Sequence, residues 1–474
     1  AVHGLLGLVS SFLLPTVCCW ALARYVLGVS LSYILHCVYL ELMLKVRRSL
    51  CNEGAANPAP PPLTREQRAA PLRGVRVRTP QSYTTCGQTL PPSKKVSTLY
   101  SKGMPVGEEL DYPHSGHSGR PAREELACGA VEDDAWRERL QCLREGAEVH
   151  RQVRQYLQQQ VRPGLELRGL AEMVEKGTAV AVGFDPKQPL RRGWAFPTGL
   201  SLNEVAAHDT VNPGDPSRWL KPNDVLKVDF GVQVEGHILD CAFSLSFDPM
   251  HDELMQAVQD ATNEGIRCSG PDALVAEIGG SIREVMEAGE VHRPDGTVFP
   301  VKSIKNLTGH SIAPYRIHAG KSLPSVNTGG SVRMLCGELW AIETFGSVGG
   351  VGYVTGLGNC SHFMRPSTDP PSKLQRSALS ESALSLLEII DHRFSTLAFC
   401  PRWLVQEAAR CKSPLLKGCD QRWWSAPLNE LCNIGVVNRY PPLADLPGAY
   451  TAQYEHTVLL GPRGKEVLTR GMDY

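Results

Sequence analysis

The stretch that most constrains the fold of this chain is Val225–Leu245, which predicts two β-strands joined by a tight turn at Glu235 and Gly236. β-branched and aromatic residues fill both arms, and each arm holds one aspartate among apolar neighbours, Asp229 and Asp240. A two-residue turn makes these aspartates diagonal neighbours on one face, roughly 5–8 Å apart. Carboxylates that close repel each other and are costly to bury, so the hairpin predicts a bound divalent cation. Two solvated aspartates on a surface hairpin are the alternative.

Composition limits the class of protein. The chain has 474 residues, 42% of them hydrophobic, and a formal net charge of zero. This predicts a globular protein with a real core and gives no electrostatic reason to expect nucleic acid or an anionic membrane as a partner. The 15 cysteines are an odd number without a C-x-x-C pair. They favour a reduced, cytoplasmic location over a disulfide framework.

Three regions differ in character. Residues 1–50 are apolar and unlike the rest of the chain, and two interpretations stay open: a membrane segment, or a start that does not belong to the natural protein. We favour the second and do not expect membrane insertion. Residues 51–125 are rich in proline and glycine and predict a linker and an N-terminal arm. Residues 126–474 are expected to form one globular domain.

Within this domain the predicted elements repeat as two helices followed by strands, twice over. That order indicates an α/β duplication around a shared sheet. The predicted helices cover residues 136–161, 167–175, 252–266 and 271–288, and the strands outside the hairpin cover 298–307, 339–345 and 451–460.

Five residues share one context, an acid or histidine inside or at the end of an apolar strand. Four carboxylates and one imidazole suit a pair of divalent ions with open positions for water. On spacing alone, five unrelated residues that each make local hydrogen bonds stay an open alternative. The five are Asp229, Asp240, His310, Glu343 and Glu455.

Longer segments of the chain match one protein family. They include AFPTGLSLNEVAAHDTVNPGD, LKVDFGVQVEGHILDCAF, KNLTGHSIAPYRIHAGKSLP, LWAIETFGS, STLAFCPRWL and YTAQYEHTVLL. From Gln88 to Tyr474 the sequence resembles the type-two (eukaryotic) methionine aminopeptidases, which are metallopeptidases of the pita-bread fold. The long separation of Glu343 from Glu455 indicates the type-two branch, because it leaves room for that branch's extra helical subdomain.

The resemblance implies an α/β architecture. Two helix–helix–hairpin halves, related by a pseudo-two-fold axis, would surround a curved and mainly antiparallel sheet. A helical insert would occupy about residues 370–445 of the domain.

The resemblance also implies a role for each ligand. Asp229 would bind one metal through both oxygens, Asp240 and Glu455 would bridge two metals, and His310 and Glu343 would bind the second. The two ions, Co, Mn, Zn or Fe, would activate a hydroxide that attacks the peptide carbonyl. Glu343 would shuttle a proton to the leaving amine.

Further residues are implied around the metals. His208 would contact the scissile peptide, and His318 would stabilise the tetrahedral intermediate by hydrogen bonding. Both histidines would also bind substrate. An apolar pocket would take the unbranched methionine side chain, although ordinary core packing is the alternative for its members. The pocket residues are Phe196, Ile317, Phe345, His362 and Tyr440.

The implied function is removal of the initiator methionine from nascent proteins with a small second residue. Nascent N-termini would be the substrates, and the ribosome and a translation initiation factor would be partners of a monomeric enzyme. The lysine-rich and acidic tracts that usually precede this domain in the family are absent, which weakens the expectation for the last two partners. The alternatives are a prolidase or proline aminopeptidase of the same fold, and a catalytically inactive pita-bread protein that binds a partner.

Overall fold

The computed structural model describes residues 63–76, 87–112, 133–410 and 422–474. The apolar segment predicted at residues 1–50 lies outside this part of the chain. No helix within these ranges is both long and apolar enough to cross a membrane. Cys336 is disulfide-bonded, so the expectation of reduced cysteines is wrong for that residue. The free thiols within the same ranges are Cys142, Cys241, Cys268, Cys360, Cys400 and Cys432.

Helices α6 (Asp134–Gln160) and α7 (Leu167–Val182) form the first predicted pair. The carboxylate of Asp133 accepts a backbone N–H of the first turn and so caps α6. The second helix is longer than the predicted range 167–175. It continues to Gly183, whose left-handed φ of 70° ends it.

Helices α8 (Asp252–Cys268) and α9 (Val275–Glu287) form the second pair. The predicted start of α9 at residue 271 is wrong by several residues. Asp272 has a φ of 68°, which is left-handed and incompatible with an α-helix, so α9 begins only after the turn that contains it.

The hairpin forms as the sequence predicts. Strands β4 (Val225–Val234) and β5 (His237–Ser246) are antiparallel, and both turn residues between them have positive φ angles. The ladder makes Asp229 and Asp240 diagonal neighbours, which confirms the predicted register. Strand β2 (Arg192–Leu202) pairs with the other edge of β4.

A second sheet has the order β1-β17-β16-β11-β9-β10, with β8 beside β11. The strands predicted at 339–345 and 451–460 are present as β11 and β16, and they pair antiparallel over nine residue pairs. The strands are β1 (Glu108–Leu110), β8 (Lys302–Ser303), β9 (Thr308–Ile312), β10 (Ser322–Pro324), β11 (Leu339–Ser347), β16 (Thr451–Leu460) and β17 (Lys465–Val467).

The strand predicted at 298–307 is wrong. The chain there forms β7 (Val298–Pro300), which pairs with β6 (Glu290–His292), and then the short β8. Pro300 has no N–H to continue the ladder. Strand β9, which follows, also pairs with β11, so His310 lies inside a strand and not beyond the end of one.

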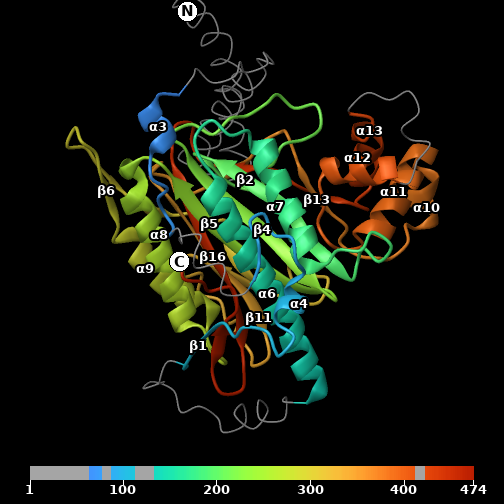
Figure 1. The fold of residues 1–474 in the computed structure, drawn as a ribbon, viewed down its shortest axis with the longest axis horizontal. Helices are drawn as coiled ribbons and strands as arrows, with labels where there is room; N and C mark the ends of the chain where they lie inside the picture. The colour runs from blue at the N-terminus through green and yellow to red at the C-terminus, as the bar shows by residue number, and fades with distance from the viewer. Residues whose placement is uncertain (1–62, 77–86, 113–132, 411–421) are drawn as a thin grey trace, which may run out of the picture. The chain divides into compact units, whose positions relative to one another are not determined.

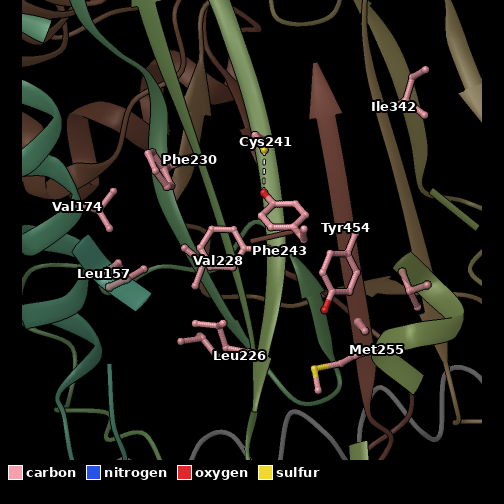
Figure 2. Packing of buried hydrophobic residues seen from close by; sticks show 14 of the residues in the cluster. Leu157, Val174, Leu226, Val228, Phe230, Cys241, Phe243, Met255, Ile342 and Tyr454 are labelled. Atoms are coloured by element: carbon pink, nitrogen blue, oxygen red, sulfur yellow. Dashed lines mark hydrogen bonds between the residues drawn. The ribbon is translucent and has the colours of Figure 1, made fainter. Parts of the chain in front are cut away.

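The two sheets meet where β5 lies beside β16. Thr457 Oγ1 accepts from the Asp240 N–H at 2.8 Å and donates to the Asp240 carbonyl at 2.6 Å. In Figure 1, helices α6, α7, α8 and α9 all lie in front of these strands. One buried cluster joins those helices to both sheets. Figure 2 shows part of it, including Leu157 and Val174 of the helices and Val228 of β4.

In the described parts of residues 373–433, four further helices follow one another and have their own apolar cluster. They occupy the region where we expect the helical insert. The chain leaves and returns through one two-stranded sheet, in which His362 of β13 pairs with Tyr440 of β14. These elements are α10 (Lys373–Ser377), α11 (Glu381–Arg393), α12 (Pro401–Arg410), α13 (Ser425–Asn433), β13 (His362–Met364) and β14 (Asn438–Tyr440). The remaining short elements are α3 (Arg65–Ala69), α4 (Val96–Leu99), η3 (Pro249–His251), β3 (Val205–Ala207), β12 (Thr355–Gly356) and β15 (Leu443–Ala444).

Candidate metal centre

Five strands each contribute one of the predicted ligand residues. Asp229 and Asp240 come from β4 and β5, His310 from β9, and Glu343 and Glu455 from β11 and β16. Nε2 of His310 lies 3.6 Å from Oδ2 of Asp240 and 3.9 Å from Oε1 of Glu343. Ligand atoms of Asp240, His310 and Glu455 all lie within 4.8 Å of one another. The fold therefore brings residues far apart in the sequence to one point on the sheet.

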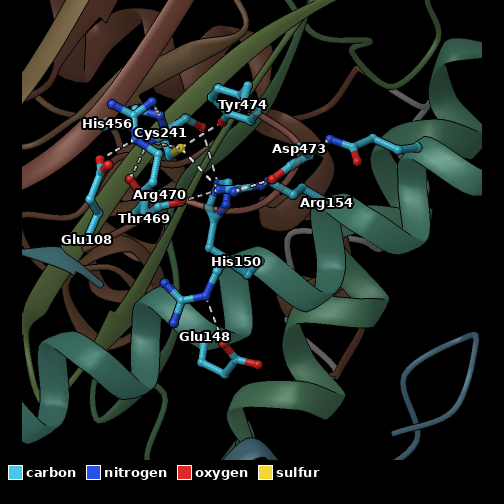
Figure 3. Close-up of polar contacts among 12 residues, drawn as sticks. Glu108, Glu148, His150, Arg154, Cys241, His456, Thr469, Arg470, Asp473 and Tyr474 are labelled. Atoms are coloured by element: carbon cyan, nitrogen blue, oxygen red, sulfur yellow. Dashed lines mark hydrogen bonds and ion pairs between the residues drawn. The ribbon is translucent and has the colours of Figure 1, made fainter. Parts of the chain in front are cut away.

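Because side chains alternate along a strand, the residues next to the ligands point to the opposite face of the sheet. Phe230 and Cys241, which follow the two hairpin aspartates, face α6. The His150 ring stacks on Phe230 with centroids 3.8 Å apart, and its Nε2 lies 3.0 Å and 3.2 Å from the carbonyl oxygens of Phe230 and Cys241. Figure 3 shows the polar cluster on this face, in which Tyr474 lies against Cys241 and His456. These contacts fix the backbone of β4 and β5, which carries the two aspartates, from the face opposite the ligands.

The acids are crowded and poorly solvated. Burial raises the pKa of Asp229 to about 7. Burial first, and repulsion by neighbouring carboxylates second, hold the pKa values of Asp240, Glu343 and Glu455 well above their usual range.

Several ligand atoms have no hydrogen-bond partner among the described residues. They are Oδ1 of Asp229, Oδ1 of Asp240 and both carboxylate oxygens of Glu455. Buried polar atoms are normally paired. Converging, unpaired carboxylate oxygens beside an imidazole are the donor set that divalent ions bind, so the residues present fit a metal centre.

A cavity of about 260 Å³ opens over this cluster. It brings together every predicted catalytic and substrate-binding residue and every predicted ligand except Glu455, which is not among the residues that line it. The predicted residues on its wall are Phe196, His208, Asp229, Asp240, His310, Ile317, His318, Glu343, Phe345, His362 and Tyr440.

The cavity also has lining residues that the sequence analysis did not single out. All but Met364 and Leu443 lie within the quoted segments that match the family, so for these a residue-by-residue reading of the segments was the available signal. These residues are Pro197, Gly199, Ala207, Asn306, Leu307, Thr308, Met364, Ala398 and Leu443.

The histidines at the cavity are mainly neutral groups. Burial lowers the pKa of His208 to about 4 and that of His362 to about 3. The His208 ring lies 5.9 Å from the His362 ring and 6.0 Å from the Tyr440 ring, between centroids. His208 has a φ of 62°, an uncommon left-handed conformation for a non-glycine residue, which is typical of functional sites. Neutral imidazoles here can donate hydrogen bonds without repelling a cation.

Comparison with known proteins identifies the family. The model of metallopeptidase family M24 matches residues 141–363. Methionine aminopeptidase 2 of Puccinia graminis f. sp. tritici is 47% identical over 394 residues, which cover 82% of this chain and 81% of the relative. Methionine aminopeptidase 2 of Dictyostelium discoideum is 43% identical over 388 residues, with coverage of 82% and 83%. The chain belongs to the methionine aminopeptidase 2 family.

Membership in the methionine aminopeptidase 2 family confirms the family that the sequence resembles, the pita-bread fold and the class of enzyme, a metal-dependent aminopeptidase. The prolidase and the binding-only alternatives are not favoured. A solved structure of a thermophilic Arx1 has a TM-score of 0.55 and 16% identity, covering 70% of this chain and 90% of that one. At that identity the likeness concerns the fold alone. Family membership and the candidate cluster also support the use of divalent metal.

Proposed function

We propose that this methionine aminopeptidase 2 family member holds two divalent metal ions and uses them to release the initiator methionine. The observation that carries the proposal is the convergence of buried carboxylate oxygens without hydrogen-bond partners at and beside the wall of the cavity. Asp240 and Glu455 would bridge the ions, Asp229 would hold the first, and His310 and Glu343 the second. Oxygen-rich ligation is compatible with Mn, Fe, Co or Zn.

When bound, such ions supply Lewis acidity and lower the pKa of water toward neutrality. The chain's own residues do the rest of the work. Glu343 takes a proton from the attacking water and delivers it to the leaving amine. His318 lies with its ring 4.5 Å from the His310 ring, between centroids, where it can donate a hydrogen bond to the oxygen on which negative charge develops. His208 contacts the scissile peptide.

The apolar wall of the cavity selects the side chain. Phe345 is only 2% exposed and Ile317 only 7%, so together with Phe196, His362 and Tyr440 they offer a dry pocket. An unbranched, polarisable thioether fills such a pocket well.

The same proposal covers the cellular setting. Substrates are N-termini of nascent proteins in the cytoplasm, the enzyme is a monomer, and the ribosome and a translation initiation factor are its further partners. The catalytic domain spans residues 126–474 and carries the helical insert at about residues 370–445. Among the described residues, those that line the cavity lie between Phe196 and Leu443, inside this domain.

A peptide assay tests the proposal. The full chain, first stripped of metal and then given Mn²⁺ or Co²⁺, is expected to release methionine from Met-Ala-Ser and to leave an Ala-Pro peptide intact. Calorimetric titration is expected to show two equivalents of metal. His310→Ala is expected to abolish both binding of the second ion and release. His292→Ala is the matched control, because His292 lies on the surface with Glu253 and is far exposed. A metal-loaded enzyme without methionine release, or an active His310→Ala variant, contradicts the proposal.

A further inference from the structure

Gln453 is a buried polar residue on the ligand face of β16. It lies two residues before Glu455, so both side chains point to the same face of the strand. It is 1% exposed and stands opposite Phe345 of β11. Ser244 Oγ accepts from its N–H at 2.8 Å and donates to its carbonyl at 2.9 Å. Its backbone is thus fixed to β5, and the side chain has a defined origin.

The amide nitrogen of Gln453 contacts two of the candidate ligands. Nε2 donates to Oδ2 of Asp229 at 3.3 Å and to Oε2 of Glu343 at 3.1 Å. The opposite amide orientation would turn a carbonyl oxygen toward both carboxylates, so electrostatics favours the orientation with nitrogen inward. The amide oxygen has no hydrogen-bond partner among the described residues. The side chain of Gln453 therefore contacts both carboxylates through its amide nitrogen.

These two carboxylates come from different halves of the fold. Asp229 lies on β4 in the three-stranded sheet, and Glu343 lies on β11 in the larger one. One amide nitrogen with two protons links them. It also leaves the other oxygen of each acid directed elsewhere: Oδ1 of Asp229 is unpaired, and Oε1 of Glu343 lies 3.9 Å from Nε2 of His310.

We propose that Gln453 is a positioning residue that fixes the orientation of Asp229 and Glu343 toward the metals and keeps the two acids at a set separation. This rests on the metal site proposed above. The amide donates to carboxylates without adding charge, so it can hold them both in the empty and in the metal-loaded enzyme. Outer partners of metal ligands usually contribute about 10–100-fold to metal affinity or activity.

Two substitutions of similar shape test the role. Gln453→Met removes both N–H donors, and Gln453→Glu replaces them with a third negative oxygen. The matched control is Gln233→Met, because Gln233 is a fully buried glutamine on β4 whose Nε2 donates to the Leu190 carbonyl at 3.1 Å and to no site carboxylate. The full-length chains are stripped of metal, their thermal unfolding is recorded, and Mn²⁺ is titrated by calorimetry.

Gln453→Met is expected to bind Mn²⁺ about 10–100-fold more weakly than wild type. Methionine release should fall mainly in kcat, because Glu343 is misoriented while the methionine pocket is intact. Gln453→Glu should destabilise the metal-free protein more than Gln453→Met does. Gln233→Met should lose thermal stability and keep the wild-type affinity.

Wild-type affinity in Gln453→Met, or an equal loss of affinity in Gln233→Met, overturns the inference and leaves the metal site standing. If Gln453→Glu does not fold, the comparison of the two methionine variants still decides. A wild-type chain that binds no Mn²⁺ overturns the proposed function, and this inference with it.

Discussion

Glu343 and Glu455 lie directly opposite each other on β11 and β16, where Glu455 is 1% exposed and the Glu343 side chain 12%. Like charges in opposed positions of a sheet repel each other. Nothing in the packing requires this arrangement, because apolar residues at the same positions would pair well. The pair is therefore a cost to stability that is offset when a cation binds between the acids, as expected where function overrides local stability.

This relationship predicts opposite effects of Glu455→Gln on stability and on activity. Without metal, the variant is expected to be more stable than wild type by about 1 kcal/mol at neutral pH, because it lacks a buried acid whose raised pKa disfavours folding there. Methionine release should be lost with the ligand. Chemical denaturation in a chelator and the Met-Ala-Ser assay measure the two effects. Glu466→Gln is the control with the reverse sign, because Glu466 accepts from Arg144 at 2.8 Å. A metal-free Glu455→Gln protein that is less stable than wild type contradicts the prediction.

The raised pKa of Asp229 predicts a pH dependence in the metal-free protein. The pKa of Asp229 is about 7 in the folded protein, whereas the pKa of an aspartic acid in an unfolded chain is about 3.9. The unfolded state thus loses its proton first, and the stability that the group contributes falls as pH rises from about 4 through about 7. Asp229→Asn lacks this loss. Its stability relative to wild type should therefore rise by about 2–3 kcal/mol between pH 5 and pH 8.

The difference between the two proteins is the quantity to measure, since buried histidines titrate in the same window with the opposite sign. Burial lowers the pKa of His208 to about 4, so its contribution rises with pH and cancels in the comparison. Denaturation curves of both proteins in a chelator suffice. A difference that stays flat with pH shows that Asp229 is already ionised in the metal-free enzyme.

Local patterns determine some elements and leave others open. The hairpin Val225–Leu245 could be predicted to the residue pair, because a two-residue turn fixes register. The opposition of Glu343 and Glu455 could not, because it depends on how two distant strands align. Their shared context, an acid inside an apolar strand, grouped them as candidate ligands without giving their register. His310 was assigned beyond a strand at 298–307, where Pro300 in fact ends the ladder. Gln453 was not singled out, because the sequence of an apolar strand does not show which carboxylates a glutamine amide would contact.

The close approach of Gly231 to the Phe196 ring predicts a way to alter the methionine pocket. It is paired with Phe196, and a Cβ at this position would lie 2.2 Å from Cε1 of the Phe196 ring. Gly231→Ala must therefore push that ring, which lines the cavity. We expect a loss of about 1–3 kcal/mol in stability from overpacking and a higher KM for Met-Ala-Ser. Gly169→Ala, which meets no atom within 4 Å, should leave KM at the wild-type value. An unchanged KM in Gly231→Ala would show that Phe196 does not shape the pocket.

The helical insert is tied to the rest of the domain by a buried ion pair. Arg402 of α12 donates to both carboxylate oxygens of Glu175 on α7 at 2.8 and 2.9 Å, and its Nε donates to the Val211 carbonyl at 2.9 Å. The Arg402 side chain is 4% exposed and the Glu175 side chain 5%.

Arg402→Met leaves a buried carboxylate without its partner and should cost about 3–5 kcal/mol. The double variant with Glu175→Met should recover most of this, since two apolar groups of similar size replace the pair. Lys176→Met, which removes a surface pair with Glu172, should cost no more than about 1 kcal/mol. Urea denaturation of wild type, Arg402→Met, Glu175→Met and the double variant gives the coupling energy. Additive effects of the Arg402 and Glu175 substitutions would mean that the pair does not hold the insert in place, and that its apolar contacts do.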